Sequence, residues 1–231
     1  MATKVGLPVD GLVWHFHPIG ILAHLFKPRP KDDLSVLRGQ VTIDAEGNDV
    51  PTSIYFSRRL HWPGGASGVT LGRGYDMKHR SWAAIKADLI AAGVEAEAAE
   101  KFALGAGLSG PAADEFVNSN RVGFGEITRE AQRILFESII YPRYESDAQK
   151  RYSDAAAVAS QSTPWEELHD RIKDIAVDLT YQQGSIWDRQ IPQLARNSLG
   201  LLAKYIRETP ELAQYEAGRQ RAVYLLRGDL D

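Results

Sequence analysis

The 231-residue chain contains no cysteine. Disulfide bonds, zinc–thiolate sites and cysteine nucleophiles are therefore excluded. A protein without thiols can work in either redox compartment, which suits one that is made in the cytosol and used outside it. The chain also lacks a surplus of positive charge, because 27 Lys and Arg stand against 30 Asp and Glu and the net charge is −3. Nucleic-acid binding, which depends on cationic contacts to phosphates, is therefore not expected.

Long hydrophobic runs are missing as well, since no run of 18 apolar residues occurs, and we expect no membrane span. The segment LVWHFHPIGILAHLF (residues 12–26) comes closest to a signal peptide. Pro18 and three histidines interrupt it, and no small-residue cleavage site follows. We therefore expect a protein made in the cytoplasm without a signal peptide. The spacing of His15 and His17, with His24, is too weak for a metal site, and we predict no metal.

The first 36 residues differ in composition from the rest of the chain. They contain four prolines and the polar stretch KPRPKDD. We predict an N-terminal appendage or linker over residues 1–36 and one folded domain over residues 37–231. The apolar part of the appendage could cover a patch on its own domain, contact a partner, or be the remnant of a fusion joint.

The folded domain reads as a small sheet followed by helices. The stretches LRGQVTI, TSIYFSRRLHW and GVTLGRGY, within Leu37–Met77, carry β-branched and aromatic residues and are separated by turn sequences. They predict three strands. An apolar stripe at Leu168, Ile172, Ile175 and Leu179 predicts a buried helix face. We therefore expect an α+β fold, with a small antiparallel sheet ahead of a mainly α-helical bundle and a cleft between them.

Start and stop signals place the helices along the second part of the chain. They are a stop at Gly93 after SWAAIKADLIAA, a start at Pro111, a cap at Thr128, a capping box at Thr163–Glu166, and a Thr-Pro start at Thr209 for one last helix.

Two carboxylates have the setting that sugar hydrolysis requires. One carboxylic acid must protonate the leaving oxygen, while a second carboxylate activates water or stabilises the sugar cation. Glu46 is expected at the end of the first strand and Asp76 at the end of the glycine-rich third strand. Glycine within a strand marks a bulge, a bend or the close approach of a ligand. We expect Gly72 and Gly74 to share the cleft-facing side of the strand with Thr70 and Asp76; the alternative is tight packing of these glycines against the protein's own helices.

In this order, the pair Glu46-Gly47 and the run Thr70-Leu71-Gly72-Arg73-Gly74-Tyr75-Asp76 resemble the lysozyme-type muramidases. The chain is most similar to the pesticin group of bacteriocin and effector lysozymes, in which the aspartate follows a Thr-x-Gly-x-Gly motif. Phage lysozymes show Glu-Gly at a helix–strand junction and have a histidine where Tyr75 stands here. The resemblance covers Leu37 to the C-terminus and implies a lysozyme-like fold.

The resemblance also implies roles. Glu46 would be the general acid, Asp76 the base that deprotonates water, and Thr70 a residue that holds this water. The bond cut would be the β-1,4 linkage between N-acetylmuramic acid and N-acetylglucosamine in peptidoglycan. No cofactor is implied.

Further candidates are less specific. Tyr55, Trp62, Arg73 and Tyr75 are expected to contact the sugar chain. The stretch from Tyr181 to Gln183 resembles the second wall of a lysozyme cleft, and roles in the core or in helix capping fit it equally well.

The expected partners are peptidoglycan glycan strands and, if one exists, an immunity protein. The expected place of action is the cell wall, in the periplasm of a target or host cell. The function predicted is that of an antibacterial effector or bacteriocin-type toxin. A phage endolysin, a lytic transglycosylase and a non-catalytic cell-wall-binding domain are the alternatives.

Overall fold

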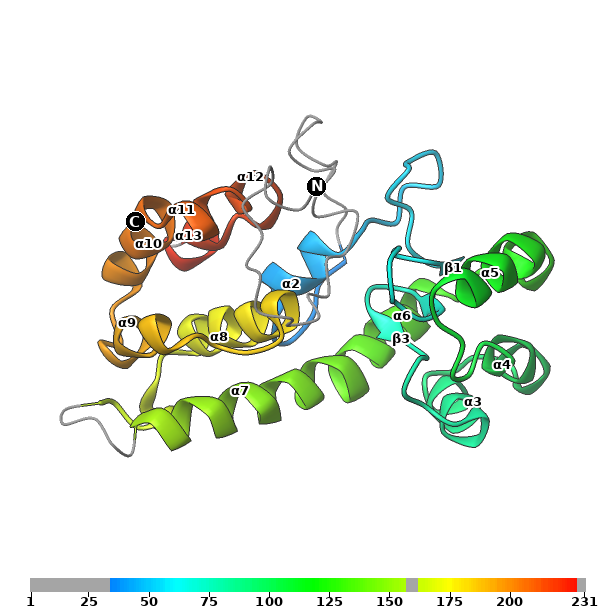
Figure 1. The fold of residues 1–231 in the computed structure, drawn as a ribbon, viewed down its shortest axis with the longest axis horizontal. Coiled ribbons are helices and arrows are strands. Elements are labelled where there is room, and N and C mark those ends of the chain that lie inside the picture. The colour runs from blue at the N-terminus through cyan, green and yellow to red at the C-terminus, as the bar shows by residue number, and fades with distance from the viewer. Residues whose placement is uncertain (1–33, 157–161, 228–231) are drawn as a thin grey trace.

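The computed structural model describes residues 34–156 and 162–227, and it is an α+β structure with a small antiparallel sheet. Figure 1 shows two lobes. One lobe holds the sheet and helices α3 to α6, and the other holds α2 and helices α8 to α13. In chain order the elements are α2 (Gln40–Ala45), β1 (Leu60–His61), β2 (Thr70–Leu71), β3 (Tyr75–Asp76), α3 (Trp82–Ala91), α4 (Ala96–Ala103), α5 (Pro111–Phe124), α6 (Arg129–Leu135), the π-helical η2 (Phe136–Ile140), α7 (Tyr141–Ala156), the 3-10 helix η3 (Trp165–Glu167), α8 (Asp170–Gln183), the 3-10 helix η4 (Asp188–Gln190), α9 (Ile191–Ala195), α10 (Leu199–Glu208), α11 (Pro210–Ala213), α12 (Glu216–Arg219) and α13 (Arg221–Leu225).

The sheet has the expected three antiparallel strands in the order β1-β2-β3, but their positions differ from the prediction. The stretch predicted as the third strand folds back on itself, so that Thr70 pairs with Asp76 and Leu71 pairs with Tyr75. Gly72 has a φ of 62° and Gly74 a φ of 98°. Glycine reaches these values without a steric penalty, and the chain therefore turns here instead of continuing as one strand.

The stretch predicted as the first strand forms helix α2 instead. Val41, Ile43 and Ala45 alternate in the sequence as strand residues do, yet all three are buried in the helix together with Thr42. Because α2 packs against both α8 and α12, almost every side of it is covered. Tertiary packing has overridden the local pattern.

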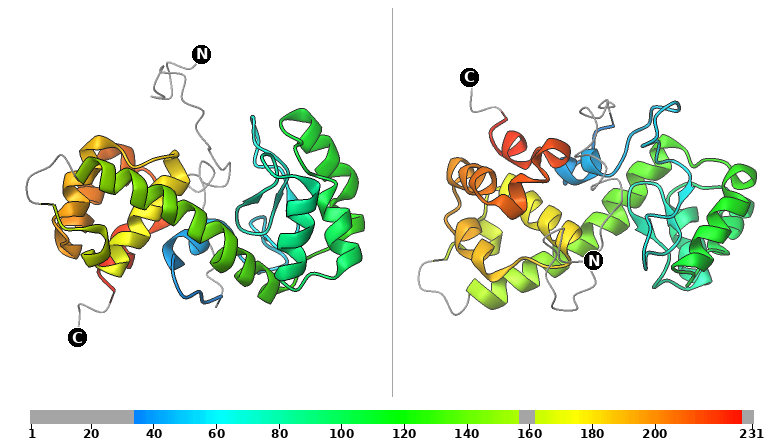
Figure 2. Two further views of the ribbon diagram at one scale, coloured as in Figure 1. Left: turned by 90° about the horizontal axis from the view of Figure 1, so that it is seen from below. Right: turned by 45° about the horizontal axis from the view of Figure 1, so that its top comes forward.

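A long helical rod joins the two lobes. Helix α6, the π-helical turn η2 and helix α7 follow one another without a break, and both views in Figure 2 show α7 running between the lobes. Thr128 caps this rod as expected, because its Oγ1 accepts a hydrogen bond from the Ala131 amide. The predicted stop at Gly93 and start at Pro111 are also confirmed.

One helix start was predicted wrongly, whereas the Thr-Pro start at Thr209 is confirmed, because α11 begins at Pro210. The Thr163–Glu166 capping box does not form, because the Thr163 hydroxyl donates to the Ala195 carbonyl instead. Helix α8 begins at Asp170, where the His169 ring accepts a hydrogen bond from the Arg171 amide. The predicted last helix is divided into α11, α12 and α13 by irregular residues.

The core follows the predicted stripe, since Leu168, Ile172, Ile175 and Leu179 are all buried. Leu34 is buried too, and its carbonyl accepts a hydrogen bond from Gln40 Nε2, so the end of the predicted appendage packs with the domain. Residues 1–33 of that appendage, with the three histidines considered for a metal site, lie outside the described residues. In the described ranges, no helix is both long and apolar enough to cross a membrane.

Candidate active site

Glu46 lies at the C-terminal end of helix α2, where the sequence predicted a strand end. Its amide donates to the Ile43 carbonyl at 3.3 Å, which fixes the backbone in the last helical turn. The side chain is 1% exposed. Its Oε1 accepts a hydrogen bond from Arg219 Nη2 at 2.6 Å, and its Oε2 accepts one from the Tyr181 hydroxyl at 3.4 Å. The carboxylate is therefore held at both oxygens by residues from α12 and α8.

Behind Glu46 lies a buried network of charges. Asp178 accepts hydrogen bonds from Arg219 Nη1 and from Arg221 Nε, both at 2.6 Å. Arg221 also donates to Gln182. With Glu46 and Glu216, this network brings three carboxyl groups together with two guanidinium groups.

The pKa values of the network follow from these opposing charges. Burial acts to raise the pKa of Asp178, but Arg219 and Arg221 outweigh it and hold that pKa below its ordinary value. Burial acts to lower the pKa of Arg219, but Asp178 and Glu46 raise it above the usual range. Asp178 is thus ionised and Arg219 protonated around neutral pH.

Thr70 and Asp76 are brought together by the β2–β3 hairpin. They are directly opposite each other, and paired residues in an antiparallel sheet project from the same face. Asp76 Oδ1 accepts a hydrogen bond from the Lys78 amide at 2.7 Å, which orients the carboxylate. Thr70 is buried, and its hydroxyl donates to the Gly68 carbonyl at 3.4 Å. The predicted base and its predicted helper therefore share one end of the hairpin.

Tyr181 lies between Glu46 and the hairpin loop at Gly74, and Tyr144 packs against Tyr181. The ring centroids of Tyr144, on α7, and Tyr181, on α8, are 4.7 Å apart. Burial raises the pKa of Tyr144, and both Asp76 and Glu46 add to this rise, so both carboxylates lie within electrostatic range of one phenol. Burial and then Glu46 raise the pKa of Tyr181 well above its ordinary value, which keeps the phenol protonated.

Three of the four residues predicted to contact sugar are buried in the structure. Tyr75 is fully buried and its hydroxyl donates to Asp88 at 2.6 Å, while Tyr55 and Arg73 are 7% and 2% exposed. The Arg73 side chain points into the protein because the chain turns at Gly72 and Gly74 instead of running on as a strand. Trp62 is only partly buried, and its Nε1 donates to the Ser67 carbonyl at 3.2 Å; its contact with sugar stays a prediction.

Gly74 does not lie on an open strand face, so the expectation that it faces the cleft is wrong. A Cβ atom at this position would lie 2.2 Å from the Tyr181 hydroxyl. The glycine is therefore needed for packing of the hairpin against α8, which is the alternative considered from the sequence.

We expect Gly74→Ala to lower the melting temperature more than Gly93→Ala does. Both glycines have positive φ, at 98° and 86°, but a Cβ at Gly93 meets open space. The clash at Gly74 should add about 1–3 kcal/mol of destabilisation to the backbone strain. Differential scanning calorimetry of both variants measures the difference. Equal losses would mean that Tyr181 moves aside at no cost, and partial recovery in Gly74→Ala/Tyr181→Phe would confirm the clash.

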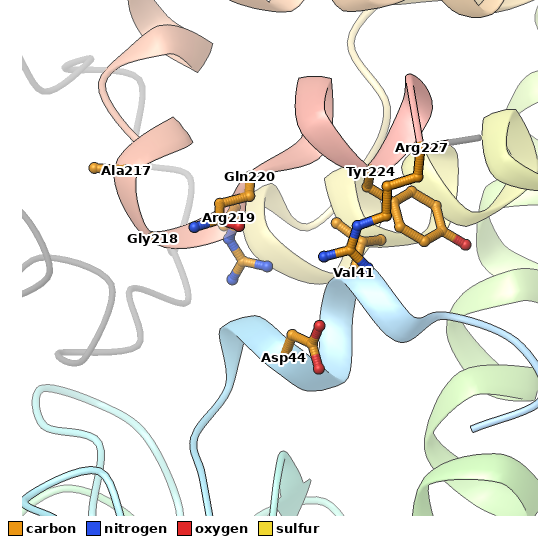
Figure 3. A pocket seen from close by; sticks show the side chains of 8 residues that line it. All are labelled: Val41, Asp44, Ala217, Gly218, Arg219, Gln220, Tyr224 and Arg227. Atoms are coloured by element: carbon orange, nitrogen blue, oxygen red, sulfur yellow. The ribbon is translucent and has the colours of Figure 1, made fainter. Parts of the chain in front are cut away.

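A small pocket is lined in part by Arg219 and does not include Glu46 (Figure 3). It has a volume of about 30 Å³, which is room for water but not for a sugar ring. Its lining comes from α2 and from the C-terminal helices: Val41, Asp44, Ala217, Gly218, Arg219, Gln220, Tyr224 and Arg227. Thr70 and Asp76 are not among these residues, so this pocket is separate from the hairpin. Within the described residues, no group of three or more His, Cys, Asp or Glu side chains could hold a metal ion.

The site thus belongs to an α+β protein in which Glu46 contacts Tyr181 and the hairpin that carries Asp76 packs against the same tyrosine. By sequence, the chain belongs to the family DUF8812, a domain of unknown function, whose model matches residues 39–217. That match includes Glu46, Thr70, Asp76 and Tyr181 and ends just before Arg219. Among the curated proteins, none matches this chain.

The sequence named Glu46, Thr70, Asp76 and Tyr181, but it missed the buried charged network behind Glu46. Arg219, Asp178 and Arg221 come from the C-terminal half, and the bond between Arg219 and Glu46 spans 173 positions. The only local sign of this network in the sequence is that Arg219 and Arg221 lie two positions apart.

Proposed function

We propose that the protein is a muramidase that hydrolyses the β-1,4 bond between N-acetylmuramic acid and N-acetylglucosamine in peptidoglycan. The observation that carries the proposal is that the Tyr181 hydroxyl contacts Glu46 Oε2 and also packs against the hairpin loop at Gly74, two residues before Asp76. Two carboxylates from different elements at one place are what glycoside hydrolysis requires.

The local structure around both motifs supports a lysozyme-like fold. Glu46-Gly47 leaves a helix, which agrees better with the helix–strand junction of the phage lysozymes than the strand predicted from the sequence. The Thr-x-Gly-x-Gly-x-Asp motif forms a hairpin with its threonine and aspartate paired. A small sheet followed by helices is the order that the resemblance to pesticin-type lysozymes implies.

In the proposed mechanism, Glu46 protonates the glycosidic oxygen as the bond to the sugar breaks. Oε1 of Glu46 is bound by the Arg219 guanidinium, which has no acceptor atom, so the proton is carried on Oε2, and the Tyr181 hydroxyl then turns to accept instead of donating. Asp76 takes a proton from water as that water attacks the anomeric carbon, and the Thr70 hydroxyl holds the water. Because water attacks directly, the configuration at the anomeric carbon inverts.

Digestion of purified sacculi followed by mass spectrometry tests the proposal. Hydrolysis releases muropeptides with reducing ends, whereas a lytic transglycosylase leaves 1,6-anhydro ends and a binding domain releases nothing. NMR of the first products should show the inverted anomer. A retained anomer would make Asp76 a nucleophile and overturn its assignment as a base.

We expect Asp76→Asn to lower the rate of sacculus digestion by about 10²–10⁴-fold, because general base catalysis is worth that much. Thr70→Ala should cost only about five- to tenfold, since a hydroxyl positions the water through one hydrogen bond. The initial rate of turbidity loss measures both variants. An equal loss in the two folded variants would contradict separate roles for the carboxylate and the hydroxyl.

The proposed setting is an antibacterial effector or bacteriocin that acts on the cell wall of a target cell, with peptidoglycan strands as its partner. The N-terminal segment outside the resemblance supports delivery by attachment to another component.

A further inference from the structure

Arg73 occupies an unusual place for an arginine. It is the middle residue of the three-residue loop, Gly72 to Gly74, that joins β2 to β3. Residues at hairpin loops normally face solvent. The Arg73 side chain is instead 1% exposed. A fully charged group placed in the interior needs a compensating set of partners.

The partners of Arg73 lie at the end of the helix that carries Glu46. Arg73 Nη1 donates to the Ile43 carbonyl at 3.1 Å. The same carbonyl accepts the amide hydrogen of Glu46. The loop of the hairpin is therefore tied to the backbone turn that fixes the candidate acid.

Further bonds hold the guanidinium in place. Arg73 Nε donates to Ser57 Oγ at 3.3 Å, and Nη2 lies 3.5 Å from Asp49 Oδ1. Gln132 of α6 closes the set, because it accepts from Ser57 and donates to Asp49, both at 2.9 Å. The loop is thus fastened to α2, to the chain that leaves it and to α6.

We propose that Arg73 is a positioning residue that sets Glu46 against the Thr70–Asp76 pair. Glu46 belongs to one lobe and the hairpin to the other, and the Arg73–Ile43 bond is a direct link between them. The role in catalysis rests on the proposed function, whereas the mechanical link does not. A displacement of about 1 Å between catalytic groups can cost about 10²-fold in rate.

Arg58 is a matched control for Arg73. Its Nε lies 3.6 Å from the same Asp49 oxygen, but its Nη1 donates to the Ile127 carbonyl and not to α2. A variant at Arg58 therefore weakens the charge balance at Asp49 without releasing the hairpin from helix α2.

The experiment compares Arg73→Lys, Arg73→Gln and Arg58→Gln in two assays. The first is kcat and KM for sacculus digestion, and the second is amide hydrogen exchange at Glu46, whose N–H shares the Ile43 carbonyl with Arg73. Lysine keeps the charge but lacks the fork that reaches several partners at once. We expect both Arg73 variants to lower kcat about 10–100-fold with KM within about twofold, and to speed exchange at Glu46. Arg58→Gln should change neither quantity.

Unchanged kcat and unchanged exchange in Arg73→Lys would overturn the proposal, and so would an equal loss of kcat in Arg58→Gln. If Arg73→Gln does not fold, Arg73→Lys decides, because it retains the buried charge opposite Asp49. If the wild-type protein does not digest sacculi, the proposed function fails. In that case the exchange of the Glu46 amide still shows whether Arg73 fastens the helix end.

Discussion

A Glu46→Gln variant is expected to fold and to digest sacculi about 10²–10⁴-fold more slowly than the wild-type protein. The amide oxygen of glutamine can still accept the hydrogen bond from Arg219, so this bond is kept, although the loss of the buried ion pair should lower stability. The amide cannot give a proton to the glycosidic oxygen, and general acid catalysis contributes about this factor in rate. The initial rate of turbidity loss gives the activity, and thermal unfolding followed by circular dichroism shows whether the variant is folded.

Glu216→Gln provides the control. Glu216 is also a partly buried glutamate beside the arginines of the C-terminal helices, and burial raises its pKa. Its Oε2 accepts a hydrogen bond from the Ala222 amide, within the C-terminal helices. This variant should retain activity close to that of the wild-type protein. A folded Glu46→Gln protein with near-normal digestion would remove Glu46 from the mechanism and leave the muramidase proposal without its acid.

The candidate acid and base could be found from the sequence because each lies in a short motif. Glu46 is followed directly by glycine, and Asp76 ends a run that begins at Thr70. The helix stop at Gly93 and the helix starts at Pro111 and Thr128 were also predictable, because caps and stops depend on residues within one helical turn. Local chemistry was sufficient for these features.

Long-range features could not be found in this way. The ion pair between Arg219 and Glu46 depends on how α12 packs against α2, and no local pattern encodes that packing. The two glycines around Arg73 fitted either a bend or the approach of a ligand. The structure decides for a bend, and the choice explains why Arg73 points into the protein while the sequence analysis placed it on the sugar chain.

Asp178→Asn is expected to lower the free energy of unfolding by about 3–5 kcal/mol, the usual cost of removing one partner from a buried ion pair. Asp178 is 0% exposed and binds Arg219 and Arg221 with separate oxygens. Asparagine offers one acceptor oxygen in place of two, and its NH₂ group would face a guanidinium. Arg221 would then lose its ion pair with Asp178, and Arg219 would keep only its ion pair with Glu46. Urea unfolding at pH 7 measures the loss.

The dependence of this loss on pH provides a second and stricter measurement. The pKa of Asp178 in the folded protein is lowered from its ordinary value, because the two arginines outweigh the effect of burial. Its contribution to stability is therefore complete above the unfolded pKa of about 3.9 and disappears as the pH falls through the lower folded pKa. The wild-type protein and Asp178→Asn should differ most at pH 6–7 and converge as the pH falls below about 4. Asp188→Asn is the control, because Asp188 pairs with Arg151 at the surface and should leave the curve close to wild type. The result that would contradict this is a difference in the free energy of unfolding between wild type and Asp178→Asn that stays constant down to pH 3. The loss would then come from altered packing, and the charge of Asp178 would not be what holds Arg219 against Glu46.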